Sequence, residues 1–320
     1  MTILGFGALN VDFIYEVEDI GFIKCGDLKL EPGKEVILEE RLFSKFSERI
    51  TRFGTLRKVS PGGSAANTCY VLSLMGMSTS LLGVLGLDRE GDFYMSKVPT
   101  DSTTHIIRRG KTGIAYIINE RGKTIEGPDR VIILIPRSNS DIKREDIDLG
   151  KISSFSWIHM SSFVSSSALD AQRFVKEALK DRTKFSIDPG EIYASLREKI
   201  HDLIFGTEIL FSSEKELTMM FGGDLESSVK EALKLTNMVV VKKGKDGASL
   251  YSKNDVIHVK AERTRAIDTT GAGDVLNGVF LGLFLKGKDP LNALEKAVFF
   301  ASESVKGYGR DNYPKDLMER

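Results

Sequence analysis

A short glycine-rich segment in the last quarter of the chain carries the residue types best suited to bind an anion. Residues 268–274 read Asp-Thr-Thr-Gly-Ala-Gly-Asp, and an apolar stretch with helical spacing follows them. The first N–H groups of a helix lack intrahelical acceptors and lie at the positive end of the helix dipole. The N–H groups of Gly271, Ala272 and Gly273 therefore predict a site for a phosphate or an oxyanion. A carboxylate at position 274 needs an explanation, because it repels a phosphate. Asp274 either caps the helix or has a function of its own.

A second glycine pair stands at another predicted helix start. Residues 62–67 read Gly-Gly-Ser-Ala-Ala-Asn, and apolar residues follow at helical spacing. Ser64 is the expected N-cap. Asn67 lies one turn into the helix, where its amide can hydrogen-bond a polar ligand near the backbone. On its own this segment could equally be a plain turn, but the early Asp12 adds a carboxylate to the same pattern.

Three other patterns are weaker. Residues 5–10, Gly-Phe-Gly-Ala-Leu-Asn, resemble a dinucleotide-binding turn, but the third glycine is missing and a strand pattern follows, so we expect no nicotinamide site. Gly-Lys-Thr occurs at 110–112 and at 122–124 without the upstream glycine of a phosphate loop. The four histidines show no metal-ligand spacing.

Composition narrows the class of protein. The chain has 320 residues, 41% hydrophobic and 28% charged, as expected for a soluble protein with a sizeable core. Its 45 Lys and Arg balance 45 Asp and Glu, so the overall charge gives no reason to expect nucleic acid or an anionic membrane as a partner. The sequence contains no run of 18 apolar residues and no secretory-signal pattern at its start. Cys25 and Cys69 are too few for a disulfide framework, so we expect reduced thiols in a cytoplasmic protein.

The elements that would position these motifs alternate along the chain. Strand patterns occur at 3–7, 11–17, 131–135, 155–160, 185–187, 208–211 and 238–241. Helical patterns occur at 41–53, 64–76, 168–180, 192–204, 214–221, 225–236, 272–286 and 290–306. This alternation predicts an α/β fold with a doubly wound, mostly parallel sheet. Residues 18–61 look like an insertion beside the core, and two alternating runs in 104–126 predict a small antiparallel ribbon as a second layer.

Together these motifs resemble the ribokinase-like, or PfkB, carbohydrate kinase family. The resemblance covers nearly the whole chain, and residues 268–274 are its most specific part. The long segment before Gly62, with Leu-Glu-Pro-Gly at 30–33, is similar to the adenosine-kinase and sugar-kinase branch. The resemblance implies one kinase domain over residues 1–320, with a β-ribbon lid formed by parts of 12–40 and 104–126. Such a lid would exclude water and limit hydrolysis of the donor.

The resemblance also implies a reaction, the transfer of a phosphoryl group from a nucleotide to a hydroxymethyl group of a sugar or nucleoside. Asp274 matches the catalytic base, and the N–H groups of Gly271, Ala272 and Gly273 match the anion hole. The positions that match acceptor binding are Asp12, Asn10, Gly62, Gly63 and Asn67. The positions that match nucleotide binding are Lys243, Gly244, Gly247, Thr269, Gly271 and Gly273. Glu216 matches the acidic position that organises Mg²⁺ through water, and a monovalent cation is expected near Asp268.

The identity of the two substrates stays open. The donor is ATP or ADP. We expect the acceptor to be a ribosyl compound, a free sugar or a nucleoside, and Phe155, Trp157 and Phe163 either stack on a base or belong to the core. The alternative is a sugar phosphate such as ribose 1-phosphate, for which Arg108 and Arg109 would supply positive charge from the predicted lid.

Two alternatives stay open, one at Ser213 and one on the apolar face of the predicted ribbon. Ser213 stands where the family often has Asn, and if this disables the metal site the chain is a non-catalytic ligand sensor on the same fold. Ser213 is also a good helix cap, followed by an acidic first turn. Apolar residues of the predicted ribbon either form a homodimer contact through the lid or pack on the domain below: Ile106, Ile114, Tyr116 and Ile118.

Overall fold

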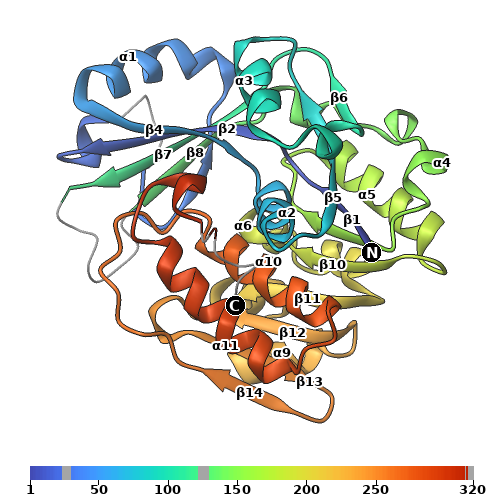
Figure 1. Ribbon diagram of the computed structural model, residues 1–320. Helices are drawn as coiled ribbons and strands as arrows, with labels where there is room; N and C mark the ends of the chain where they lie inside the picture. Colours follow the sequence, from blue (N-terminus) through green and yellow to red (C-terminus); the bar gives the residue numbers. More distant parts are fainter. Residues whose placement is uncertain (24–29, 122–129, 314, 316–320) are drawn as a thin grey trace.

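A central β-sheet positions the predicted motifs. In the computed structural model, which describes residues 1–23, 30–121, 130–313 and 315, nine of the described strands form this larger sheet (Figure 1). They are β1 (Thr2–Phe6), β5 (Ser78–Leu85), β6 (Ile106–Arg108), β9 (Trp157–Ser161), β10 (Lys184–Asp188), β11 (Thr207–Ser213), β12 (Thr236–Lys242), β13 (Ala248–Ser252) and β14 (Val256–Val259). Their order is β14-β13-β12-β11-β10-β9-β1-β5-β6, parallel throughout except at β13 and β14.

Helices cover both faces of this sheet, because successive residues of each strand point to opposite faces and both sets are apolar. In β1, Leu4 and Phe6 pack into one core cluster and Ile3 into the other. The first cluster contains side chains from α5 (Ser166–Leu179), α6 (Gly190–Ala194), α7 (His201–Ile204), α8 (Glu214–Phe221) and α9 (Leu225–Ala232). The second contains side chains from α2 (Ser64–Leu74), α3 (Arg89–Lys97), α10 (Ala272–Leu285) and α11 (Pro290–Ser304).

A second, mixed sheet stands apart from the first, at the upper left of Figure 1. Its strands, in spatial order, are β3 (Glu35–Ile37), β8 (Arg130–Ile135), β7 (Gly113–Glu120), β2 (Asn10–Val17) and β4 (Gly54–Gly62). The helix α1 (Phe43–Phe53) covers its outer face with Phe46 and Ile50. The other face carries Ile14, Ala115 and Ile117, packed with Tyr308 from near the C-terminus.

Short helical turns connect these elements. They are η1 (Ile20–Ile23), η2 (Glu40–Leu42), η3 (Thr100–Thr103), η4 (Arg137–Ser140), η5 (Arg144–Asp146), α4 (Leu149–Ile152), η6 (Arg197–Ile200), η7 (Gly244–Asp246) and η8 (Gly309–Asn312). The helix expected over 192–204 is divided into α6, η6 and α7, where Arg197 has a φ of 52°. The other predicted helices and the main-sheet strands after residue 155 are confirmed within a few residues.

The predicted antiparallel ribbon in 104–126 is wrong. Residues 106–108 form β6, which pairs in parallel with β5 in the larger sheet. Residues 113–120 form β7, which pairs in parallel with β2 and antiparallel with β8. Residues 131–135, expected in the larger sheet, are this antiparallel partner. Alternation of apolar residues shows that a segment is a strand but not which strand it pairs with.

The apolar face proposed for a dimer is largely covered. Ile114, Tyr116 and Ile118 are buried with α1 side chains, and Tyr116 contacts Phe46 edge-on at 4.9 Å between ring centroids. Ile106 packs against the core of the larger sheet. A homodimer through the second sheet therefore has no support from this face.

Several expectations concern residues outside the described ranges. Cys25, the Gly-Lys-Thr at 122–124 and residues 122–126 of the expected lid lie there. Cys69 is a buried free thiol, as expected for a reduced cysteine. None of the helices in the described ranges combines the length and apolar character that crossing a membrane requires.

Candidate active site

The C-terminal ends of the parallel strands meet at one edge of the larger sheet, and polar residues gather there. Asp188 ends β10, Ser213 ends β11 and Lys242 ends β12. β1 leads into Asn10 and Asp12 at the start of β2. β1 has β9 and β5 as neighbours, so the order of strands reverses at this point. Open α/β sheets bind ligands at such a position.

Asp274 is the third residue of α10, and two donors from α2 fix its orientation. Ser64 Oγ donates to Oδ1 and Asn67 Nδ2 donates to Oδ2, each at 2.7 Å. Burial raises the pKa of Asp274 to about 6, against the lowering effect of these two hydrogen bonds. A carboxylate with this pKa can accept a proton near neutral pH. Ser64, expected to cap α2, binds Asp274 instead, and Gly63 is the N-cap residue.

The turn before α10 presents backbone N–H groups. Gly271 has a φ of 79°, and a β-carbon there would lie 1.8 Å from the Tyr313 hydroxyl, so a glycine is required. The N–H groups of Gly271 and Gly273 have no acceptor among the described residues. The Ala272 N–H donates to Thr269 O at 3.3 Å. The predicted anion hole therefore has two N–H groups without an acceptor among the described residues, and the third already has a weak partner.

The acceptor-side residues lie together where β2 pairs with β4. The carboxylate of Asp12 covers Gly62, where a β-carbon would lie 2.0 Å from Oδ1. Gly63 has a φ of 98°, and a β-carbon there would lie 2.0 Å from a backbone oxygen. Asn139 Nδ2 donates to Asn10 Oδ1 at 2.9 Å and fixes that amide. Burial raises the pKa of Asp12 to about 8.

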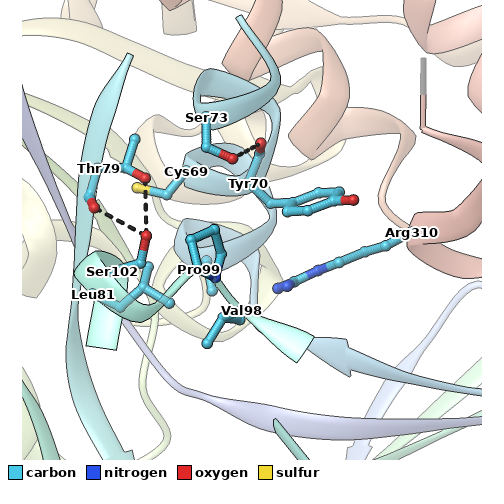
Figure 2. Close-up of a pocket in the computed structure, with 10 residues that line it drawn as sticks. Cys69, Tyr70, Ser73, Thr79, Leu81, Val98, Pro99, Ser102 and Arg310 are labelled. Atoms are coloured by element: carbon cyan, nitrogen blue, oxygen red, sulfur yellow. Dashed lines mark hydrogen bonds between the residues drawn. The ribbon is translucent and has the colours of Figure 1, made fainter. Parts of the chain in front are cut away.

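Arg310, on η8, contacts this site although no sequence pattern singles it out. Its Nε donates to Asn67 Oδ1 at 2.7 Å. Because a guanidinium only donates, it determines which end of the Asn67 amide faces Asp274. Arg310 is 5% exposed, and its Nη1 and Nη2 have no partner of good geometry among the described residues. Figure 2 shows the guanidinium below Tyr70, reaching a small pocket behind α2.

Three of the predicted nucleotide-binding residues, Lys243, Gly244 and Gly247, form the hairpin turn between β12 and β13, whereas the other three lie at or just before the start of α10. The Lys243 N–H donates to Gly247 O at 2.8 Å, and the Gly247 N–H donates to Gly244 O at 3.1 Å. Gly247 has a φ of 93°, and a β-carbon there would lie 2.0 Å from Val259 O. Lys243 Nζ lies 3.3 Å from Glu214 Oε1, so the turn is beside the start of α8.

The start of α8 is a capping box. Ser213 Oγ accepts a hydrogen bond from the Glu216 N–H at 3.2 Å, and Glu216 Oε2 accepts one from the Ser213 N–H at 2.7 Å. The capping interpretation of Ser213 is therefore confirmed. The described residues contain no group of three or more His, Cys, Asp or Glu side chains that could hold a metal ion, so Glu216 belongs to no such cluster.

Asp268 is a candidate ligand for a cation. Its Oδ1 accepts a hydrogen bond from the Thr270 N–H at 3.0 Å, and its Oδ2 is buried without a partner among the described residues. Burial raises the pKa of Asp268. An orphaned carboxylate oxygen is a hard ligand of the kind that oxygen-binding cations prefer.

The aromatic and basic residues considered for the acceptor have other partners. The aromatic residues are buried in the core of the larger sheet: Phe155, Trp157 and Phe163. Arg108 Nη2 pairs with Asp92 Oδ1 at 2.7 Å, and Arg109 Nη1 pairs with Asp146 Oδ1 at 2.6 Å. The core interpretation of the aromatics is thus confirmed, and the two arginines belong to β6 and the residue after it, outside the second sheet.

Comparison with known proteins gives one family and one fold. Residues 39–316 match the sequence profile of the pfkB family carbohydrate kinases. An uncharacterised sugar kinase from Archaeoglobus fulgidus is 29% identical over 253 residues, which are 77% of this chain and 99% of the relative. The structure is similar to that of adenosine kinase from Sinorhizobium meliloti, with a TM-score of 0.86, 16% identity and coverage of 99% of this chain and 97% of the other. A putative ribokinase II from E. coli in complex with ATP and Mg²⁺ has a TM-score of 0.78 at 20% identity, over 99% and 97% of the chains.

Proposed function

The chain belongs to the pfkB family of carbohydrate kinases, and we propose that it transfers the terminal phosphoryl group of ATP to a hydroxymethyl group of a neutral sugar. Members of this family are phosphotransferases that act on hydroxyl groups of sugars or nucleosides. The observation that carries the proposal is the position of Asp274. It is oriented by Ser64 and Asn67 and stands directly after a turn with unpaired N–H groups.

Each part of this arrangement has a role in the proposed reaction. Asp274 accepts the proton of the acceptor hydroxyl as the oxygen attacks the phosphorus. The N–H groups of Gly271 and Gly273 donate to phosphoryl oxygens, where negative charge is concentrated. Asp12 and Asn67, with Asn10 fixed by Asn139, provide the carboxyl group and amides that orient sugar hydroxyls. The turn at 243–247 lies on the nucleotide side.

Mg²⁺ would neutralise charge on the donor phosphates. Glu216 belongs to no cluster of three or more metal-binding side chains among the described residues, so we propose that it contacts the ion through water and that phosphates and water supply the remaining ligands. The partnerless Oδ2 of Asp268 would hold a monovalent cation beside the anion turn. Glu216→Gln keeps an acceptor for the Ser213 N–H but removes a charge, so it should raise the Mg²⁺ concentration needed for half-maximal rate. Superimposable Mg²⁺ titrations would contradict this assignment.

The two arginines and three aromatic residues considered for the acceptor favour a neutral sugar. Arg108 and Arg109 are occupied by Asp92 and Asp146, so they offer no charge to a sugar phosphate. The core aromatics offer no stacking face to a nucleobase. We therefore place a free sugar ahead of a nucleoside, and ribose 1-phosphate third.

A substrate screen tests the proposal. Purified protein is assayed for nucleotide consumption with ATP or ADP, in the presence of ribose and related sugars, of nucleosides, or of ribose 1-phosphate. We expect turnover with ATP that requires a free sugar. Binding of acceptors without any turnover would instead support the non-catalytic sensor. Activity on a sugar phosphate alone would overturn the proposed acceptor but not the kinase.

The control for the screen is Asp274→Asn. This change preserves the side-chain shape but removes the proton acceptor, so kcat should fall by at least about 10²-fold. Nucleotide affinity, measured by calorimetry, should stay within a few-fold of wild type. Near-normal turnover by this variant would remove Asp274 from the proposed role.

A further inference from the structure

Lys242 is a basic residue at the candidate site to which the function proposed above gives no role. It is the last residue of β12, in register with Ser213 at the end of β11. Its Nζ lies 2.5 Å from Asp188 Oδ2, and Asn277 Nδ2 donates to the same oxygen at 2.6 Å. Asp188 ends β10 and Asn277 lies on α10, so α10 helps to fix the carboxylate that holds this ammonium group.

The ammonium group lies against the anion turn. A β-carbon built on Gly273 would be 3.4 Å from Lys242 Cδ and 3.5 Å from Nζ. The Gly273 N–H is one of the two unpaired donors of that turn. The Lys242 side chain is 17% exposed, whereas that of Asp188 is 5% exposed. The Lys242 side chain is therefore held by the buried Asp188 and is still partly accessible to solvent.

The carboxylates around Lys242 keep it charged. Burial opposes its charge, but Asp188, Glu216 and Asp274 outweigh burial and raise the pKa of Lys242. The charge of Lys242 in turn lowers the pKa of Asp274. Lys242 therefore interacts with both the candidate base and the candidate metal-organising residue. In phosphoryl transfer the migrating group occupies the region between these two components.

We propose that Lys242 is a catalytic residue whose ammonium group donates a hydrogen bond to the phosphoryl group during its transfer, and that Asp188 and Asn277 are its positioning residues. This proposal rests on the proposed kinase function. The acceptor oxygen forms a bond to the γ-phosphorus, the bond from that phosphorus to the leaving ADP oxygen breaks, and the hydroxyl proton goes to Asp274. Lys242 gives up no proton. It adds a positive charge where the turn supplies two unpaired N–H donors.

The competing explanation is a structural ion pair. A buried pair such as Lys242–Asp188 gives weak evidence of stabilisation by itself, and replacing both charges by neutral groups is often tolerated. Removal of Lys242 alone would leave Asp188 as an uncompensated buried charge, so the single variant Lys242→Met cannot separate the two explanations. The double variant Lys242→Met/Asp188→Asn separates them, because it removes both charges at once.

We expect the double variant to keep its melting temperature near that of wild type and to lose at least about 10²-fold in kcat, as when one transition-state donor is removed. In calorimetry without acceptor, its affinity for ATP should fall about tenfold or more, the effect of a lost charge-assisted hydrogen bond, while its affinity for ADP stays within about twofold. Recovery of kcat and ATP affinity to within a few-fold of wild type would show that the pair is structural and would overturn the proposal.

Two controls complete the experiment. Lys184→Met/Glu208→Gln removes another lysine–carboxylate pair between β10 and β11, at the opposite end of these strands, and should leave kcat unchanged. If the double variant loses ADP binding and has therefore unfolded, Lys242→Gln replaces it, because its amide still donates to Asp188. Loss of kcat in that variant with ADP binding intact supports the proposal, and wild-type kcat contradicts it.

Asp274→Asn is measured in parallel. Normal turnover there refutes the kinase mechanism itself, whereas an inactive Asp274→Asn beside an active Lys242 variant refutes the role of Lys242 alone.

Discussion

At the scale of single residues, the amide of Asn67 connects the candidate base to the C-terminal segment. It accepts a hydrogen bond from Arg310 and donates one to Asp274. Rotating the amide by 180° would place its oxygen against the carboxylate of Asp274 and its NH₂ group against the donor of Arg310. Both contacts would then be repulsive. The guanidinium therefore selects the orientation in which Asn67 lowers the pKa of Asp274.

Replacing Arg310 should change the pH dependence of catalysis. In Arg310→Leu the Asn67 amide loses the donor that holds its oxygen, so the hydrogen bond from Asn67 to the charged form of Asp274 weakens and the pKa of Asp274 rises from about 6. Because the ionised form is the active base, the acidic limb of the kcat/KM profile should move to higher pH by up to about one unit. Arg144→Leu, which removes an exposed pair with Asp170, is the control and should leave the profile unchanged. Superimposed profiles for Arg310→Leu and wild type would contradict the connection.

Asp12 should reduce stability at neutral pH. Burial raises its pKa from 3.8 to about 8, so the folded chain retains a proton that the unfolded chain releases. The stability that this proton contributes to the folded chain is fully present below about pH 4 and is lost as the pH rises towards 8. Asp12→Asn has no such dependence. In urea titrations, the free energy of unfolding of the variant minus that of wild type should therefore increase by at least about 1 kcal/mol from pH 5 to pH 8. The affinity of the variant for sugar should fall. A difference that stays constant over this range would argue against a protonated Asp12.

At the scale of elements, α8 depends on its capping box, and substitutions of Ser213 test how much the cap contributes. Asn accepts the Glu216 N–H as well as Ser does, so Ser213→Asn should be neutral for stability. Ser213→Ala should cost about 1 kcal/mol of unfolding free energy in urea titrations. Equal stability of the Ala variant and wild type would show that the cap contributes nothing. A gain in kcat for Ser213→Asn would show that the serine weakens the metal site.

The helices, strands and local turns could largely be predicted from the sequence. The pairing of the strands and the long-range side-chain contacts could not. The glycines of residues 268–274 were informative because a left-handed φ and a helix start are local properties of a few residues. The pairing of residues 106–108 and 131–135 was wrong, because alternation gives the face of a strand and not its neighbour. The contacts that orient the base span large separations, 207 residues from Asn67 to Asp274 and 243 from Arg310 to Asn67. No spacing rule covers such distances, so Arg310 and Lys242 emerge only from the folded structure.

At the scale of the whole molecule, the second sheet is attached to the rest at several polar contacts. Lys34 Nζ lies 3.6 Å from Glu191 Oε1 on α6, and Lys58 of β4 pairs with Asp311 of η8. Tyr308 donates to Glu16 of β2 at 3.2 Å. These contacts are compatible with the proposed lid over the acceptor site that we propose beside Asp12. Exposed ion pairs contribute little energy, so they permit opening for substrate entry.

The homodimer expected through this sheet remains a prediction, and light scattering tests it. With Ile114, Tyr116 and Ile118 buried against α1, a dimer would have to use other surfaces. A mass of about 71 kDa at micromolar concentration would support the dimer, twice the 35.4 kDa of one chain. A monomeric mass would contradict it. A cytoplasmic location also remains a prediction.

The contact of Arg310 with Asn67 also determines when, during synthesis, the candidate base acquires its orientation. The candidate site combines Asn10 and Asp12 with Tyr313, which lies beside Gly271 and is synthesised long after them. The larger sheet can assemble earlier, but the base is not oriented until residues 310–313 have left the exit tunnel. A chain that still lacks residues 310–313 should therefore hold the candidate base without the contact that orients it, even where the larger sheet has already formed.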